Sequence, residues 1–516
     1  MNDNSKKKYN AAFDLINRNL TNHAEKVAFI DNNKSINYKD LNINIQNISQ
    51  KFIDLGLNKG DRIVICIYDS IFYPICFLGA IWSGIIPICI NTMLPKKDLK
   101  YMIEDSGANC VITSSDLLDI FENIKEETNE NLLILSDSSD ISNNLSIEDL
   151  LKDYENKKIN PANTYDSDVC FWLYSSGSTG PPKGTLHIHK NLISTANSYA
   201  KEVLQIKESD ICFSAAKLFF AYGLGNALTF PMSVGATSIL VSDRPTPDLV
   251  SSVIKKYNVT LFFGVPTLYA AIINSNPNPI NFKSLRLSIS AGEALPAHLC
   301  EKWKLLMGTD VLDGIGSTEM LHIFISNRVD ELIPGASGTP VSGYEARLIN
   351  DEGKIINNYN EIGELEVKGP SSAISYWNKP VKSKSTFKGE WTKTGDKYVR
   401  DNKGIYRYCG RADDMMKVSG QYVSPFEVEA ALQSHDSVLE AAVVSNRDND
   451  DLIKPKAYIV LNMGFKAEKS LELDLTNHVK SKLTPFKYPR WYEFIEELPK
   501  TATGKIQRFK LRKNDK

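Results

Sequence analysis

The segment with the clearest capacity for chemistry is a loop rich in glycine and hydroxyl groups, Tyr174-Ser-Ser-Gly-Ser-Thr-Gly-Pro-Pro-Lys-Gly184. Glycines let the backbone turn its N–H groups inward, and the serine and threonine hydroxyls add donors, so the loop suits phosphate oxygens. Its spacing differs from the G-x-x-x-x-G-K-[ST] pattern of the common NTPase loop. The apolar residues before it argue against a plain surface turn. We therefore predict a phosphate-binding loop between a strand and a helix.

Other short motifs add charged and hydroxyl groups further along the chain. Asp313-Gly-Ile-Gly-Ser-Thr-Glu319 is a second glycine and hydroxyl loop, whose carboxylate Glu319 suits Mg²⁺ on a triphosphate. Thr394-Gly-Asp396 places an acid after a tight turn, where it can accept from ribose hydroxyls. Pro499-Lys-Thr-Ala-Thr-Gly-Lys505 is a basic loop. Taken singly, the loop ending at Glu319 is also compatible with an ordinary turn, and the basic segment with a solvated tail.

The elements that must position these residues follow an α/β pattern. Strand-like runs alternate with longer amphipathic or apolar segments, as in sheets covered by helices on both faces. We predict strands at 62–68, 108–113, 131–137, 169–174, 261–264 and 285–290, the last three leading into loops and helices. Residues 138–167 are predicted to be a polar surface connection, and a hairpin is predicted to turn at 401–404.

A second, smaller unit is predicted after residue 414. Ser424-Pro-Phe-Glu427 has the form of a capping box, which opens a helix that runs to Gln433. Strands at 437–445, 455–462 and 490–495 and a helix at 470–483 complete a small α+β domain.

Composition excludes several classes of protein. The 516 residues are 42% hydrophobic and 24% charged, which excludes disordered, collagen-like and coiled-coil chains. The 60 Lys and Arg residues nearly balance the 62 Asp and Glu residues, so a nucleic-acid partner is not expected. The uncharged run 71–90 is interrupted by proline and glycine, which favours a buried helix and strand over a membrane span. Eight cysteines without a C-x-x-C pair, and no signal peptide, favour reduced thiols in the cytoplasm.

The motifs taken together resemble a known family. Five motifs occur in the order found in the adenylate-forming superfamily of acyl-CoA synthetases, adenylation domains and luciferases. They lie at 174–184, 317–319, 394–396, 410–414 and 499–505. The segments 219–226, 313–324 and 418–427 resemble those of benzoate–CoA ligases. The resemblance implies an α/β core domain of layered sheets with a small β-barrel-like part over residues 1–411, followed by a mobile α+β lid domain over residues 412–516. A monomer or homodimer without membrane attachment is expected.

The resemblance also implies a reaction in two halves. Benzoate, or a small substituted benzoate, attacks the α-phosphorus of ATP to give an aryl-adenylate and diphosphate. The thiol of coenzyme A then displaces AMP and forms aryl-CoA, so ATP, Mg²⁺ and coenzyme A are the expected cofactor and co-substrates of an acid–thiol ligase.

Roles for individual residues come only from this resemblance. Lys505, Thr318 and Glu319 are expected to be catalytic, with Lys505 between the carboxylate and the α-phosphate, Thr318 on the α-phosphate and Glu319 on Mg²⁺. ATP is further expected to contact Ser176, Gly177, Ser178, Thr179, Gly180, Lys183, Gly292, Glu293, Ala294, Asp313, Gly314, Ile315, Gly316, Ser317, Asp396 and Arg411. Ile315 stands where many family members have an aromatic residue, so aliphatic contact with adenine is expected instead of stacking. Asp413 is expected to be the hinge, and the loop from Lys417 to Gly420 is expected to serve the thioester step.

The acyl group is expected in a flat apolar slot. By motif position the slot is lined by Ala221, Tyr222, Gly223, Ala291, Gly316, His322 and Ile323. Small residues and apolar walls suit an aromatic ring better than a long chain. His322 is expected to close the slot or to bond a ring substituent, although a packed structural histidine is also possible. Replacing Gly316 by leucine is expected to fill the slot, and His187 and His189 are expected only to begin a helix.

Three alternatives stay open at this point. One is an aryl-acid adenylating enzyme that loads the thiol of a carrier protein. Another is a ligase for hydroxybenzoate, aminobenzoate or another small carboxylate. A non-enzymatic alternative is a nucleotide-binding sensor on the same fold.

Overall fold

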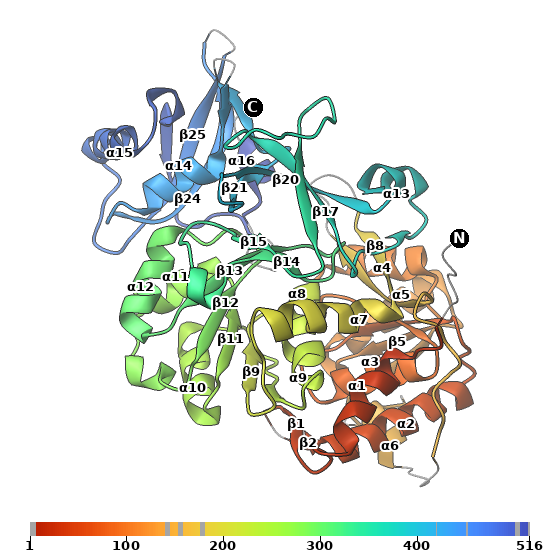
Figure 1. The fold of residues 1–516 in the computed structure, drawn as a ribbon. Coiled ribbons are helices and arrows are strands. Elements are labelled where there is room, and N and C mark those ends of the chain that lie inside the picture. Colours follow the sequence, from red (N-terminus) through yellow and green to blue (C-terminus); the bar gives the residue numbers. More distant parts are fainter. Residues whose placement is uncertain are drawn as a thin grey trace.

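The computed structural model describes residues 7–32, 34–139, 145–152, 158–175, 181–418, 421–449, 452–500 and 506–513. Two large sheets flanked by helices form the first part of the chain, a half-barrel of strands follows, and a small α+β unit ends it (Figure 1). One apolar core joins the two large sheets, since Phe29 and Leu218 belong to the same buried cluster as Ile63 and Phe171. The small unit has a buried cluster of its own, which includes Val428, Ile459 and Leu475.

The first large sheet has the strand order β18-β8-β7-β4-β3-β5-β6. Its strands are β3 (Arg62–Cys66), β4 (Ile86–Cys89), β5 (Cys110–Thr113), β6 (Leu133–Ser136), β7 (Val169–Ser175), β8 (Lys183–Ile188) and β18 (Ser375–Tyr376). Strands β3 to β7 are parallel to one another, whereas β8 is antiparallel to β7 and to β18. The helices of this part are α2 (Tyr38–Asp54), α3 (Phe72–Trp82), α4 (Lys96–Ser106) and α5 (Leu118–Thr128).

The second large sheet has the order β15-β14-β13-β12-β11-β9-β10-β1-β2. Its strands are β1 (Val27–Ile30), β2 (Ser35–Asn37), β9 (Ile211–Ser214), β10 (Thr237–Ile239), β11 (Leu261–Gly264), β12 (Leu287–Ser290), β13 (Val311–Gly316), β14 (Ile323–Ser326) and β15 (Thr339–Pro340). Its helices include α10 (Pro247–Tyr257), α11 (Pro266–Asn274) and α12 (Ala297–Met307). Further helical segments contribute to the apolar cores around this sheet. They are α1 (Ala11–Leu20), α7 (His189–Thr195), η2 (Ala196–Lys201), α8 (Ala221–Leu224), η3 (Gly225–Thr229) and α9 (Phe230–Met232).

The half-barrel and the small unit complete the chain. The half-barrel contains β16 (Glu345–Ile349), β17 (Gly363–Lys368), α13 (Pro380–Thr386), β19 (Phe387–Lys388), β20 (Trp391–Arg400) and β21 (Tyr406–Arg411). The small unit, drawn in blue in Figure 1, contains β22 (Met416–Val418), β23 (Gln421–Val423), α14 (Pro425–Gln433), β24 (Val438–Arg447), β25 (Ile453–Leu461), α15 (Lys469–Lys482), β26 (Trp491–Phe494) and α16 (Arg508–Lys513).

Most predicted elements are confirmed. The uncharged run 71–90 forms the buried helix α3 and the strand β4. All eight cysteines are buried and free. Within the described ranges no helix combines the length and apolar character that crossing a bilayer requires. The capping box is only half formed, because Ser424 accepts from the Glu427 N–H at 3.0 Å, while the Glu427 carboxylate pairs with Lys487 instead.

Two predictions about the loops were wrong, and a third was incomplete. The phosphate loop lies in a hairpin between β7 and β8, because the residues after it pair with β7 before helix α7 begins. The Thr394–Asp396 segment is not a turn but lies inside β20, where Gly395 has a φ of +75° next to an irregularity in the pairing. The surface connection at 138–167 contains a short helix, α6 (Ile147–Lys152).

Candidate functional site

The two ends of the predicted phosphate loop are both tied to helix α4. At the start, the Tyr174 hydroxyl donates to Asp105 Oδ2 at 2.8 Å. At the end, the Pro182 carbonyl accepts from the Tyr101 hydroxyl at 3.3 Å. These contacts fix the base of the loop. The middle of the loop lies outside the described residues, and with it the predicted contacts Ser176, Gly177, Ser178, Thr179 and Gly180.

Lys183 is the first residue of β8 and lies half-buried directly after the loop. Its Nζ lies 4.5 Å from the centre of the Tyr376 ring. Burial lowers the pKa of Lys183, and the negative charge of Glu319 partly opposes that shift. A partly desolvated ammonium attracts a phosphate more strongly than a fully hydrated one, because the effective dielectric constant around it is lower.

The segment after β13 carries Thr318 and Glu319, both half-buried. The Tyr376 hydroxyl donates to Glu319 Oε1 at 2.7 Å, and the Ala373 N–H donates to the Glu319 carbonyl at 2.7 Å. Among the described residues there is no group of three or more His, Cys, Asp or Glu side chains that could hold a metal ion. One carboxylate completed by phosphate oxygens is nevertheless a usual environment for Mg²⁺. The residues therefore fit a magnesium ion that arrives with a triphosphate.

His187 connects the phosphate hairpin to this segment. Its Nε2 lies 2.8 Å from the Thr318 carbonyl, and its Nδ1 lies 3.2 Å from Asn191 Oδ1. Burial lowers the pKa of His187 to about 4, so the ring is neutral at pH 7. A neutral ring has one N–H, and the shorter contact assigns it to Nε2, which donates to Thr318. The expectation that His187 only begins a helix was wrong, since it lies in β8 and supports the Thr318 backbone.

The residues predicted to contact adenine lie at the ends of adjacent strands. Gly292, Glu293 and Ala294 follow β12, and Asp313 lies opposite Ser290 in β13. Asp313 Oδ1 is buried and has no hydrogen-bond partner. Burial raises the pKa of Asp313 well above its ordinary value. An unpaired buried acceptor is costly unless a donor arrives, and the exocyclic amino group of adenine is a donor of the required kind.

The small unit contacts this adenine region. The Ile506 N–H donates to Glu293 Oε1 at 3.3 Å. Ile506 directly follows Lys505, which itself lies outside the described residues. The chain next to the predicted catalytic lysine is therefore bound at the edge of the predicted nucleotide site.

Asp396 and Arg411, predicted to hold the ribose, form a pair across β20 and β21. Arg411 Nη1 donates to Asp396 Oδ1 at 3.1 Å and to the Thr394 carbonyl at 3.1 Å. The neighbouring carboxylate of Asp396 raises the pKa of Arg411 further. Gly395 leaves room for this pair, because a Cβ there would lie 2.8 Å from Arg411 Nη2. The predicted hinge residue Asp413 lies 3.7 Å from Arg411 Nε.

The predicted acyl residues Tyr222 and His322 lie in a buried aromatic cluster. The His322 ring lies 4.4 Å from Phe230, 5.5 Å from Tyr222 and 5.4 Å from Tyr199, measured between ring centres. His322 Nε2 donates to Asn226 Oδ1 at 3.0 Å. Burial lowers the pKa of His322 to about 3, so it is uncharged at neutral pH.

Sequence reasoning missed three members of this cluster. Tyr199 and Phe230 lie on helical segments whose apolar pattern looked like ordinary core. Asn226 lies in the 219–226 segment that carried the resemblance, and its membership of that segment was its signal in the sequence.

Two predicted slot residues have tight backbone surroundings. A Cβ at Gly316 would lie 2.7 Å from the His322 carbonyl oxygen and 2.9 Å from the Ile323 nitrogen. A Cβ at Gly223 would lie 2.0 Å from the Lys217 carbonyl oxygen. The expectation that Gly316→Leu fills a slot was therefore wrong, because the new side chain would collide with the backbone of 322–323. Ala291 and Ile323 are buried, and Ala221 is half-buried.

Lys417, predicted to serve the thioester step, contacts the half-barrel. Its Nζ lies 3.6 Å from Asp351 Oδ2 and 4.8 Å from the centre of the Tyr422 ring. Asp351 also accepts from the Tyr422 hydroxyl at 2.5 Å and from Lys397 Nζ at 2.9 Å. The hydrogen bonds from Tyr422 and Lys397 lower the pKa of Asp351 to about 2. Gly420 lies outside the described residues.

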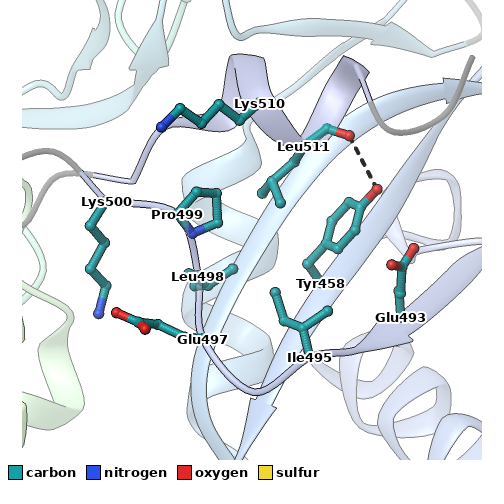
Figure 2. Close-up of a pocket in the computed structure, with 9 residues that line it drawn as sticks. All are labelled: Tyr458, Glu493, Ile495, Glu497, Leu498, Pro499, Lys500, Lys510 and Leu511. Carbon is teal, nitrogen blue, oxygen red and sulfur yellow. Dashed lines mark hydrogen bonds between the residues drawn. The ribbon is translucent and has the colours of Figure 1, made fainter.

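A cavity of about 600 Å³ lies in the small unit and contains none of the predicted site residues. Figure 2 shows its lining, with the Tyr458 hydroxyl donating to the Leu511 carbonyl across its wall at 3.2 Å. Lys500 points away from this bond, and its Nζ pairs with Glu440 at 2.6 Å. The residues predicted to bind the nucleotide and the acyl group lie elsewhere, on the large sheets, the half-barrel and the edge of the small unit.

Comparison with known proteins gives a consistent result. Residues 16–377 match the AMP-binding enzyme family, and residues 427–505 match the AMP-binding enzyme C-terminal domain. The chain is 50% identical to a benzoate–CoA ligase of Thauera aromatica over 98% of this chain and 96% of that one. It is 44% identical to a 4-hydroxybenzoate–CoA/benzoate–CoA ligase of Rhodopseudomonas palustris, over 98% and 94% of the two chains.

Solved structures agree with these relatives. A benzoate CoA ligase from Burkholderia xenovorans LB400 superimposes with a TM-score of 0.91 at 44% identity, over 98% of this chain and 100% of that one. An anthranilate CoA ligase in complex with anthranoyl-AMP superimposes with a TM-score of 0.95 at 39% identity, over 98% and 97% of the two chains. The predicted fold class is thereby confirmed.

Proposed function

The chain belongs to the AMP-binding enzyme family of adenylate-forming enzymes, and on that premise we propose that it is an ATP-dependent benzoate–CoA ligase. In the first half-reaction a benzoate oxygen bonds to the α-phosphorus of ATP, the bond between the α-phosphorus and the bridging oxygen breaks, and diphosphate leaves. In the second half-reaction the sulfur of coenzyme A bonds to the acyl carbon, and AMP leaves. The products are benzoyl-CoA, AMP and diphosphate.

The observation that carries this assignment is the 50% identity to a benzoate–CoA ligase over 98% of the chain. The aromatic cluster around His322 supports it. Flat apolar walls suit a ring of benzoate size, and a neutral histidine adds no charge that would repel or trap it. The anthranilate CoA ligase that superimposes on this chain is also an aryl-CoA ligase, so the proposed class of reaction is supported by more than one relative.

The chemical problem of the first half-reaction is negative charge, since one anion must approach a polyanion. Lys183 and the N–H groups of the phosphate hairpin would neutralise the β- and γ-phosphates, and Lys505 would lie between the benzoate and the α-phosphate. Preorganised cations and donors of this kind stabilise the charge that builds up in the transition state. A magnesium ion held by Glu319 would draw further charge from the phosphate oxygens.

The rest of the nucleotide would be held by groups already in position. Asp396 would accept from the ribose hydroxyls, with Arg411 keeping its carboxylate in place. Asp313 Oδ1 would take the amino group of adenine. The bond from Ile506, the residue after Lys505, to Glu293 at the predicted adenine site supports a role for Lys505 in the first half-reaction.

For the second half-reaction we propose that the lid, residues 412–516, rotates about Asp413. In this structure Lys417 pairs with Asp351, which is not one of the groups assigned to ATP. Rotation would take Lys505 out and bring the Lys417–Gly420 loop in, which would open a path for the thiol. A hinge needs only a few residues to absorb the dihedral change.

The test is AMP formation from ATP and Mg²⁺, with and without coenzyme A, across a panel of acids. The panel contains acetate, octanoate, benzoate, hydroxybenzoates, aminobenzoates and phenylacetate. We expect turnover with benzoate that requires coenzyme A, with some hydroxybenzoate or aminobenzoate accepted more slowly.

Other outcomes would replace the proposal. Diphosphate release without coenzyme A-dependent turnover would point to the thiol of a carrier protein. Activity only with aliphatic acids would remove the acyl-site assignment. ATP binding without any turnover would favour the sensor alternative over the enzyme.

A further inference from the structure

We propose that Tyr376 is a positioning residue for metal-bound ATP, with its hydroxyl holding the Glu319 carboxylate and its ring holding the Lys183 ammonium. The inference rests on the proposed function, because that function assigns both partners to ATP. Tyr376 was not among the residues predicted from the sequence. It is 4% exposed and belongs to β18, a two-residue strand at the edge of the first large sheet.

The segment that carries Tyr376 is bonded to both the strand of Lys183 and the backbone of Glu319. Tyr376 pairs with Thr185 of β8, so it is in register with the strand that begins at Lys183. Three residues earlier, the Ala373 N–H donates to the Glu319 carbonyl at 2.7 Å. The short segment 373–376 therefore binds the backbone of Glu319 and, through the Tyr376 hydroxyl, also its side chain.

The hydroxyl suits a permanent hydrogen bond to a carboxylate. It donates to Glu319 Oε1 at 2.7 Å, and burial together with the Glu319 charge raises the pKa of Tyr376 well above its ordinary value. Tyr376 thus orients one carboxylate oxygen. Glu319 therefore loses less conformational entropy when a cation binds.

The ring suits the neighbouring cation. Lys183 Nζ lies 4.5 Å from the ring centre, a distance at which the negative face of the ring attracts an ammonium. Phe387 packs against the same ring with 5.2 Å between the ring centres, which limits its movement. One side chain therefore holds two opposite charges in separate places, the carboxylate on its hydroxyl and the ammonium on its face.

Two substitutions separate these roles. Tyr376→Phe keeps the ring beside Lys183 and removes the donor to Glu319. Tyr376→Leu removes both. The matched control is Tyr406→Phe, which deletes a hydroxyl that donates to the Ala346 carbonyl at 2.9 Å in the half-barrel.

The measurement is calorimetric titration of each protein with ATP, in magnesium chloride and in EDTA, without benzoate or coenzyme A. The informative quantity is the factor by which magnesium tightens ATP binding. We expect Tyr376→Phe to reduce this factor about tenfold and to leave binding in EDTA within about threefold, because a hydrogen bond to a charged group is lost. We expect Tyr376→Leu to weaken binding in EDTA as well.

An unchanged magnesium factor in Tyr376→Phe would overturn the proposal, as would an equal reduction in Tyr406→Phe. Absence of any magnesium effect in the unmodified protein would overturn it too. The proposed function is judged separately, by benzoyl-CoA formation in the unmodified protein. If Tyr376→Leu does not fold, Tyr376→Phe still decides the role of the hydroxyl.

Discussion

At Gly225 the absent side chain leaves the space that the His322 ring occupies, because a Cβ there would lie 2.4 Å from His322 Cδ2 and 3.2 Å from Phe230 Cζ. Gly225 begins the π-helical segment η3, and its neighbour Asn226 holds the His322 ring. Adding one methyl group at this position would therefore act on the wall of the predicted acyl region. Glycine is needed here for space and not for an unusual backbone angle.

Gly225→Ala is expected to push the His322 ring aside and break its bond to Asn226. The KM for benzoate should rise about tenfold or more, while the KM for ATP stays within about twofold. Steady-state kinetics with each substrate varied in turn provide the measurement, and the thermal unfolding midpoint reports whether the fold survives. Equal changes in both KM values would show that His322 does not border the acyl group.

At the scale of elements, the contacts between the small unit and the rest of the chain centre on a few charged pairs. Asp351, between β16 and β17, holds Lys417 and Tyr422 of the β22–β23 hairpin. Within the small unit itself, Arg508 of α16 pairs with the buried Glu429 of α14 at 2.7 Å. Asp413, whose side chain is 45% exposed, lies in the short connection between β21 and β22. The elements on either side of this connection are held firmly, so rotation would be concentrated in the connection itself.

Asp413→Pro is expected to spare the first half-reaction and to block the second, because proline fixes φ and prevents the hinge from turning. Benzoate-dependent exchange of diphosphate with ATP should stay within about threefold. Formation of benzoyl-CoA from supplied benzoyl-adenylate should fall by on the order of a hundredfold, since the rotation precedes it. Equal loss of both half-reactions would contradict the hinge role.

At the scale of the whole molecule, several histidines are kept neutral inside the fold. Burial lowers the pKa of His187 and His189 to about 4 and that of His322 to about 3. His189 lies far from the chemistry and accepts from the Ala11 N–H at 3.2 Å through Nδ1, which ties α7 to α1. In the unfolded chain these rings take up a proton near pH 6.5, whereas in the fold they do so only at lower pH. Acid therefore favours unfolding.

The stability that His189 contributes should be complete above about pH 6.5 and decline as the pH falls toward 4. The free energy of unfolding of the unmodified protein, minus that of His189→Gln, should fall by about 2 kcal/mol between pH 6.5 and pH 5. Urea unfolding of both proteins at pH 7, 6 and 5 measures this difference. Buried acids such as Asp69 change the free energy of unfolding of both proteins equally, so they cancel in the difference. A constant difference across this range would contradict the neutral, buried state of His189.

The local chemistry of this protein was readable from its sequence. Glycine and hydroxyl spacing predicted a phosphate loop, and the alternation of strands and helices correctly identified the α/β class, because both patterns depend on neighbouring residues. The order of the motifs indicated the family. The apolar run 71–90 was correctly assigned to a buried helix and strand, although Pro74 and Gly79 lie inside helix α3 and only Gly84, with a φ of +76°, separates the helix from β4.

Only the tertiary structure decided how distant residues meet. Tyr376 bonds Glu319 from 57 positions away, Asn226 bonds His322 from 96, and Ile506 bonds Glu293 from 213. It also decided that the predicted phosphate loop connects two paired strands, and that a side chain added at Gly316 would meet the backbone of 322–323. Such facts depend on which strands pair and in which register. The physical reason is that pairing and packing are set by the whole core, whereas sequence spacing reports only what one element does by itself.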